Sequence, residues 1–370
     1  MHNTYAFKVM LLLCLFLLLE SVLATEPATD STGEALTTVL ESVVQSSPAV
    51  QIKRDAPDYP RLELRKGREA WVHVTYCIDE TGTIQNVSVL DSIGNESFDK
   101  AAIKTVENWE YEPAIQDGKP AWQSRNEVYI NFAIEKDDLG ASRKFIRQFN
   151  KLGDYLEAGK LEDADKLFWQ VYETSNLSLY ELGKLWAQRV RYEAMTGDYY
   201  RLNLALKRAT ASHGIWIEKE SYVRLLKIRV QVEIQLGKYS QALHSFDDLV
   251  DAADDDAEEV AELQPVIERL RSIIDGDKVL PINAEVRERG GCLYCNNSWD
   301  FTPVRNDFTI TNIQGNLDSL DMRCDNKRLE AKVADLLEWH IPEKWGKCHI
   351  QIYGEPGTTF DVLMMPADIS

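Results

Sequence analysis

Apolar and polar residues alternate in three stretches between residues 59 and 135, which predicts three strands. Residues 71–79 (WVHVTYCID) and 83–92 (TIQNVSVLDS) are rich in β-branched and aromatic residues, and the Asp-Glu-Thr-Gly turn where they meet predicts a hairpin. A third alternating run, VYINFAI, occupies residues 128–134. The pattern therefore predicts a small antiparallel sheet.

Between the second and third strands the apolar period becomes helical. One face of the predicted helix holds Phe98, Ala101, Ala102, Val106 and Trp109. Ser97 is expected to cap this helix, and Pro113 is expected to end it because proline cannot continue the hydrogen-bond ladder. The connection WEYEPAIQDGKP, residues 109–120, is interpreted as a packed helix exit with its turn at Asp117-Gly118.

From residue 141 to 276 the pattern is helical, with turns marked by Gly159, Gly197 and Gly237, which are 38 and 40 residues apart. Each glycine is followed at equivalent positions by small or apolar residues: Leu161, Ala164 and Phe168; Tyr199, Leu202 and Leu206; Tyr239, Ala242 and Phe246. This resembles tetratricopeptide repeats, whose period is about 34 residues. Such arrays build surfaces for partner proteins, and a plain helical spacer is the alternative.

After Pro281 the alternation returns and predicts a small β-sandwich or roll. The fold class is therefore multidomain α+β. The expected organisation is a signal peptide at 1–24, a linker at 25–50, a β-β-α-β domain at 51–137, helical hairpins at 141–276 and a β-rich domain at 280–370.

The first residues predict a secretory signal peptide. Lys8 precedes an apolar run at 9–19, and Val22, Leu23 and Ala24 form a small-residue exit suited to cleavage after Ala24. The run is shorter than the ~20 residues that a spanning helix needs. We therefore expect a periplasmic protein, with an uncleaved inner-membrane anchor as the alternative. The linker is expected to hold a short helix at 35–45.

The net charge of −19 argues against a nucleic-acid partner, because phosphate binding needs clustered Lys and Arg. Hydrophobic residues make up 44% and charged residues 27% of the 370, which is an ordinary globular balance.

Four cysteines lie in the last domain: Cys292, Cys295, Cys324 and Cys348. In an oxidising compartment they favour disulfides between neighbours, Cys292 with Cys295 and Cys324 with Cys348. A zinc site and a redox CxxC pair are weaker alternatives, because the spacings are wide and no helix start follows the CxxC pair. Cys14 would leave with the signal peptide, and Cys77 is expected to be a buried thiol.

Residues 59–134 resemble the C-terminal domain of the TonB family of periplasmic energy transducers. The stretches that carry the resemblance, in family order and near family spacing, are Tyr59-Pro60, Gly67, WVHVTYCIDETGTI, VSVLDS, FDKAAI, WEYEPAIQDGKP and VYINFAI. Ala70 departs from the family, which usually has glycine before the strand. The resemblance covers roughly a fifth of the chain, so it indicates a domain and not a whole-protein role.

In that family the domain binds a short extended peptide of an outer-membrane receptor, which adds to the edge of the last strand. Carried over to this chain, the resemblance implies a binding edge formed by Val128, Tyr129, Ile130, Asn131, Phe132 and Ala133. The side chains of Val128, Ile130 and Phe132 are expected to face the core, whereas Tyr129 and Asn131 face away and could contact the ligand. The alternative is that this edge is covered by the region that follows.

A full transducer of the family also has a membrane anchor and a long proline-rich spacer, whereas the linker here holds only Pro27 and Pro48. We therefore expect a periplasmic protein- or peptide-binding module linked to outer-membrane receptor or transport systems. Its expected partners are an extended peptide of an envelope protein and other envelope proteins that contact the helical repeats. A membrane-anchored transducer for transmembrane transport is the alternative.

An enzyme is the least favoured class. The sequence holds no nucleophile elbow, HExxH, phosphate loop or paired-carboxylate motif, and its six histidines are scattered. No cofactor or metal is expected, since the acidic run at 247–262 does not have the spacing of a calcium-binding loop.

Overall fold

The computed structural model describes residues 47–134, 140–254, 257–288 and 297–366. Within them, residues 48–115 and those from 120 onward belong to one compact unit. The predictions on the signal peptide, the helix at 35–45, and Cys292 with Cys295 lie outside the described residues. Among the described helices, none is long and apolar enough to cross a membrane.

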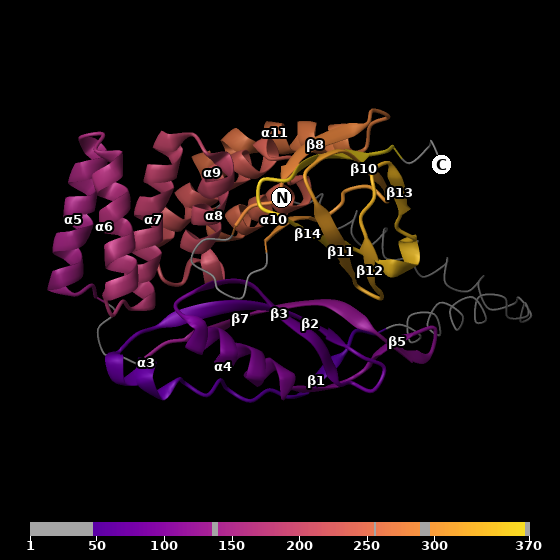
Figure 1. Ribbon diagram of the computed structural model, residues 1–370, viewed down its shortest axis with the longest axis horizontal. Helices are drawn as coiled ribbons and strands as arrows, with labels where there is room; N and C mark the ends of the chain where they lie inside the picture. The colour runs from indigo at the N-terminus through magenta and orange to yellow at the C-terminus, as the bar shows by residue number, and fades with distance from the viewer. Residues whose placement is uncertain (1–46, 135–139, 255–256, 289–296, 367–370) are drawn as a thin grey trace, which may run out of the picture. The chain divides into compact units, whose positions relative to one another are not determined.

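Residues 48–134 are called the sheet region, and of these 48–115 and 120–134 belong to this unit. Its elements are β1 (Val50–Lys53), α3 (Arg61–Lys66), β2 (Ala70–Ile78), β3 (Ile84–Ile93), α4 (Glu96–Glu107), β4 (Glu110–Glu112), β5 (Ala114–Gln116), β6 (Lys119–Ala121) and β7 (Gln123–Phe132). Strands β3, β2 and β7 form an antiparallel sheet in that order. Helix α4 lies along one face of it, with Phe98, Ala102 and Val106 in the shared core (Figure 1).

The β2–β3 turn depends on Gly82. Its φ of +83° lies in the left-handed region, and a Cβ atom there would lie 1.7 Å from the carbonyl oxygen of Tyr111. A backbone hydrogen bond joins this turn to β4: the Tyr111 N–H donates to the Gly82 carbonyl oxygen at 3.1 Å. The structure therefore requires glycine at position 82, where the sequence pattern predicted only a turn.

Two details of the predicted helix are wrong. Asn95, and not Ser97, is the N-cap, because the Asn95 side chain accepts a hydrogen bond from the Ser97 N–H at 2.9 Å. The helix ends at Glu107, six residues before Pro113, so the proline does not end it. The following segment forms the short strand β4, which pairs with β1. Asp117 and Gly118 do form the expected turn, with φ angles of 51° and 71°.

Residues 140–276 are called the helical region. Its elements are α5 (Arg143–Glu157), α6 (Leu161–Thr174), α7 (Leu179–Thr196), α8 (Tyr199–Ala209), η1 (Ala211–Gly214), α9 (Lys219–Gln235), α10 (Tyr239–Ala252) and α11 (Glu258–Ile274). Figure 1 shows α5 to α9 as helices that run beside one another. Gly159, Gly197 and Gly237 lie at the turns α5–α6, α7–α8 and α9–α10 with φ between 67° and 78°. The assignment to tetratricopeptide repeats stays a prediction.

The helical region covers the face of the sheet opposite α4. Trp71 of β2 and Ile93 of β3 belong to the apolar core of the helices. Arg208 of α8 is 1% exposed and donates to both carboxylate oxygens of Asp91 on β3, at 2.7 to 3.2 Å. The Arg208 guanidinium carbon also lies 4.7 Å from the centre of the Trp186 ring. A buried ion pair and apolar packing thus join the sheet to the helices.

Residues 279–366 are called the sandwich region. Its elements are β8 (Leu280–Glu285), β9 (Ser298–Phe301), β10 (Asp307–Gln314), β11 (Leu317–Cys324), β12 (Arg328–Lys332), β13 (Leu337–His340), η2 (Glu343–Trp345), β14 (Cys348–Gly354) and β15 (Thr359–Met364). They form two antiparallel four-stranded sheets, β13-β10-β15-β8 and β12-β11-β14-β9. Both sheets contribute to one apolar core, as a sandwich requires.

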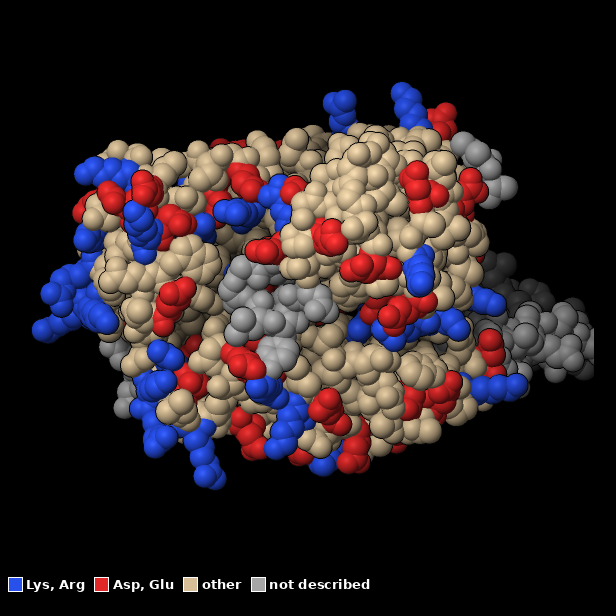
Figure 2. All heavy atoms as spheres, in the orientation of Figure 1, with Lys and Arg blue, Asp and Glu red and all other residues tan. Residues whose placement is uncertain are grey.

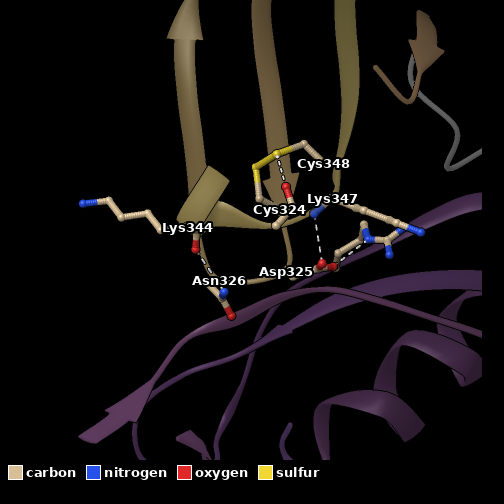
Figure 3. The surroundings of a disulfide bond; sticks show 8 residues. Cys324, Asp325, Asn326, Lys344, Lys347 and Cys348 are labelled. Carbon is tan, nitrogen blue, oxygen red and sulfur yellow. Dashed lines mark hydrogen bonds and ion pairs between the residues drawn. A yellow bond between two sulfur atoms is a disulfide. The ribbon is translucent and has the colours of Figure 1, made fainter. Parts of the chain in front are cut away.

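Cys324 at the end of β11 is bonded to Cys348 at the start of β14, with an S–S distance of 1.98 Å (Figure 3). This is the pairing expected from adjacency. Cys77 is a buried free thiol. Burial raises the pKa of Cys77, which keeps the thiol protonated and unreactive at neutral pH.

Candidate functional site

Strand β7 lies at one end of the three-stranded sheet and pairs with β2, from Phe132 opposite Ala70 to Gln123 opposite Ile78. Its apolar side chains enter the core beneath α4. Ile130 is 4% exposed and Phe132 is 1% exposed, and Val128 packs against the same core. These three side chains therefore hold the strand in place, as the alternation predicts.

The side chains of Tyr129 and Asn131 point to the other face of the sheet, where the helical region lies. The Tyr129 ring stacks on His73, with centroids 4.2 Å apart, and meets the Trp71 ring edge-on at 5.4 Å. The Asn131 Oδ1 atom accepts a hydrogen bond from Ser212 Oγ at 3.0 Å. Both side chains therefore have intramolecular partners, although they do face away from the core beneath α4.

Groups outside the three-stranded sheet contact both ends of β7. At its start, the Ser124 N–H donates to the carbonyl oxygen of Asp325 at 3.2 Å. At its end, the hydroxyl of Tyr59 lies 3.4 Å from the Phe132 carbonyl oxygen. Between these two points, the described residues provide β7 with no main-chain partner strand other than β2. The middle of the edge is the part that an incoming strand could use.

The contact at the start of β7 comes from the turn that follows β11 (Figure 3). The Asp325 side chain also accepts two hydrogen bonds. Arg125 Nε donates to its Oδ1 atom at 3.0 Å, and the Lys347 N–H donates to its Oδ2 atom at 2.9 Å. The Cys324–Cys348 bond joins the residue before this turn to the start of β14. Sequence reasoning did not find Asp325 or Ser212, because both lie far along the chain and no local pattern marks them.

One ion pair lies beside the middle of the edge. His73 Nε2 is 3.1 Å from Glu127 Oε2. Partial burial raises the pKa of Glu127, but the hydrogen bond and charge of His73 outweigh it and lower the pKa to about 2. Glu127 therefore stays ionised beside the middle of the β7 edge, where it is paired with His73.

Among the described residues, no group of three or more His, Cys, Asp or Glu side chains could hold a metal ion. Two open cavities, of about 510 and 480 Å³, both border Arg328 and Glu330 on β12. Arg328 there is paired with Asp321 at 2.9 Å.

Part of the chain matches a known protein family. Residues 55–134 match the family described as "Gram-negative bacterial TonB protein C-terminal". Protein TonB of Pseudomonas aeruginosa is 31% identical over 85 residues, 23% of this chain and 25% of the relative. Protein TonB of Vibrio cholerae is 28% identical over 95 residues, 26% of this chain and 38% of the relative.

Among solved structures, the solution structure of the Pseudomonas aeruginosa TonB C-terminal domain matches at 29% identity and a TM-score of 0.23. It covers 25% of this chain and 92% of that one. The chain thus spans from a quarter to about four-tenths of the length of these two curated relatives. Residues 55–134 carry a TonB C-terminal domain, and the helical and sandwich regions lie outside the match.

Proposed function

We propose that the protein is a TonB-type protein of the cell envelope that binds an extended segment of another envelope protein. The incoming segment adds as a strand to β7 along Val128–Ala133. The observation that carries the proposal is the position of β7: it is the outermost strand of the sheet, within the residues that match the family.

The physical basis is main-chain pairing. An outermost strand offers N–H and C=O groups to a further strand, and each new pair of residues adds hydrogen bonds that need no particular side chain. Tyr129 and Asn131 are held by Trp71, His73 and Ser212, so they contribute little selectivity. Selectivity comes instead from the two ends of the edge and from the charge of Glu127, which disfavours an acidic residue beside it.

The wider role in the proposal is envelope energy transduction, which the resemblance of residues 55–134 to the TonB C-terminal domain implies. The protein does not catalyse a reaction, and it acts in the periplasm. The helical region gives a second surface for envelope proteins. An inner-membrane anchor at the N-terminus remains the alternative, since a transducer must be fixed to the membrane to transmit force.

The test is a pull-down from envelope extracts with a charge placed on the edge. Asn131→Lys is expected to weaken capture of the partner more than about tenfold, because a lysine on an edge strand discourages strand addition. The matched control is Ser212→Ala. It removes the same hydrogen bond to Asn131 but leaves the edge uncharged, so its capture should match the wild type.

Two results would count against the proposal. Equal capture by the lysine variant and the wild type would show that β7 is not the site. Equal loss in the lysine and Ser212→Ala variants would show that the contact with the helical region matters, and not the edge. Circular dichroism and thermal unfolding verify that both variants fold.

A further inference from the structure

Helix α5 exposes a basic face on a strongly acidic protein. Arg143, Lys144, Arg147 and Lys151 are all exposed, and none lies within 4 Å of a described acidic side chain. No acidic residue occurs in α5 before Asp154. Ile146, in the middle of this face, is 45% exposed. The helix thus presents four cations around an aliphatic side chain.

Helix α3 has the same character. Arg61, Arg65 and Lys66 are exposed, while Leu62 and Leu64 are 50% and 47% exposed. The acidic residue of this helix, Glu63, is 2% exposed and is paired with Arg68 at 3.3 Å and with Lys66 at 4.0 Å. The solvent-facing part of α3 is therefore basic and aliphatic.

Both helices are attached to the start of α7. After α3, the Glu69 N–H donates to the Leu177 carbonyl, and Glu69 Oε2 accepts the Leu179 N–H at 2.7 Å. Before α5, the Ser142 N–H donates to Glu181 Oε1 at 2.8 Å. Figure 2 shows Lys and Arg gathered along the left side, where Figure 1 has α3 and α5. We call this the basic-aliphatic surface: Arg61, Leu62, Leu64, Arg65, Lys66, Arg143, Lys144, Ile146, Arg147 and Lys151.

We propose that the basic-aliphatic surface docks the protein onto an anionic lipid membrane. Basic residues attract acidic headgroups, and aliphatic side chains between them can enter the boundary between headgroups and acyl chains. A folded protein with a net charge of −19 would be repelled by such a membrane in most orientations. Because charges beyond about 8 Å are screened at physiological salt, the surface that faces the lipid decides the attraction.

The exposed leucines and isoleucine favour a lipid partner over an acidic protein. An acidic protein surface would neutralise the cations but would leave Leu62, Leu64 and Ile146 without apolar contacts. A bilayer surface satisfies both kinds of side chain at once. This inference does not depend on the peptide edge, because none of the surface residues belongs to β7.

The test is co-sedimentation of the full chain with vesicles. One set holds about a third phosphatidylglycerol in phosphatidylcholine, and the other is phosphatidylcholine alone. The difference between the two sets reports headgroup attraction and removes any binding that does not depend on charge. The wild type should prefer the anionic vesicles, and the preference should disappear at high salt.

Two variants locate the contact. Arg65→Glu with Lys144→Glu and Arg147→Glu should lower the affinity for anionic vesicles more than about tenfold, because each basic residue near the surface contributes to the attraction. The matched control reverses three exposed lysines elsewhere, Lys104→Glu, Lys278→Glu and Lys332→Glu, and so changes the net charge equally. It should keep at least half of the wild-type binding.

Equal binding to the two vesicle sets by the wild type would overturn the proposal. So would an equal loss of binding in both triple variants, since that would report net charge alone. If the basic-aliphatic variant instead loses an acidic protein partner in crosslinking while vesicle binding is unchanged, the surface serves a protein and the proposal is wrong. Peptide capture by β7 is scored separately and should not change.

Discussion

At the scale of single residues, Asp99 on α4 is a buried carboxyl group whose ionised form is disfavoured by desolvation. It is 2% exposed, and its Oδ1 atom is buried without a hydrogen-bond partner among the described residues. Burial raises its pKa to about 6, although the hydrogen bond with Ser92 acts in the opposite direction. An ionised Asp99 is therefore destabilising at neutral pH.

This gives a pH dependence with a definite sign. The folded pKa of about 6 lies above the unfolded value of about 3.9, so the folded state holds its proton more tightly. The stabilisation from protonated Asp99 is complete below about pH 4 and is lost as the pH rises through about 6. Asparagine at position 99 does not titrate, so Asp99→Asn should avoid this loss and raise the free energy of unfolding at pH 7 by about 3 kcal/mol.

Urea unfolding of Asp99→Asn at several pH values measures this effect. Glu107→Gln, an exposed carboxyl on the same helix, is the control and should follow the wild type. If the free energy of unfolding of Asp99→Asn depends on pH as steeply as that of the wild type, the titration does not belong to this residue.

At the scale of elements, the alternation of residues identified β2, β3 and β7, and the helical period identified α4. These patterns are readable because each is created by which side chains face one local core. The cap at Asn95 was missed because Ser97, two residues later, is also a good capping residue. The pairing of β1 with β4 could not be predicted, since it joins exposed strands about 60 residues apart.

The candidate edge was likewise predictable only in part. Its strand and its buried side chains follow from the alternation and from the family resemblance. The contacts of Asp325 with Ser124 and of Ser212 with Asn131 bring together residues 201 and 81 positions apart. No periodicity in the sequence encodes such contacts, because they depend on how separate regions pack.

The Cys324–Cys348 bond is the covalent constraint on β11 and β14, and it closes a loop with a sequence separation of 24. Replacing both cysteines with serine should lower the unfolding free energy by about 2–4 kcal/mol, mainly by enlarging the unfolded ensemble. Guanidinium unfolding of the variant and the wild type measures this difference.

Thiol labelling under denaturing conditions is the companion measurement. Without reductant, Cys324 and Cys348 should not react, whereas Cys77 should. Labelling of both Cys324 and Cys348 before reduction would rule out the bond in the isolated protein.

At the scale of the whole molecule, the sheet region is joined to the rest by buried polar contacts. Arg208 of the helical region pairs with Asp91 on β3, and Arg323 of the sandwich region donates to the Asn86 carbonyl oxygen at 3.1 Å. These contacts lie on one face of the sheet, and among the described residues the middle of β7 has no main-chain partner strand other than β2. The family match identifies the sheet region, but the sequence alone could not show that its second face is covered.

Whether the N-terminal segment is cleaved decides between a periplasmic binding protein and a membrane-anchored transducer. We expect cleavage after Ala24, because a short apolar run is followed by a small-residue exit. Intact-mass measurement of the protein from envelope fractions should therefore give a chain that begins at Thr25. A mass that retains residues 1–24 would favour the membrane-anchored transducer.

Hydrogen–deuterium exchange tests the central claim most directly. The full chain is compared alone and in complex with the partner recovered from envelope extracts. The account predicts that amides within Val128–Ala133 gain protection in the complex, because an added strand accepts their hydrogen bonds, while amides of α4 change little. Protection that appears in the helical region and leaves Val128–Ala133 unchanged would contradict it.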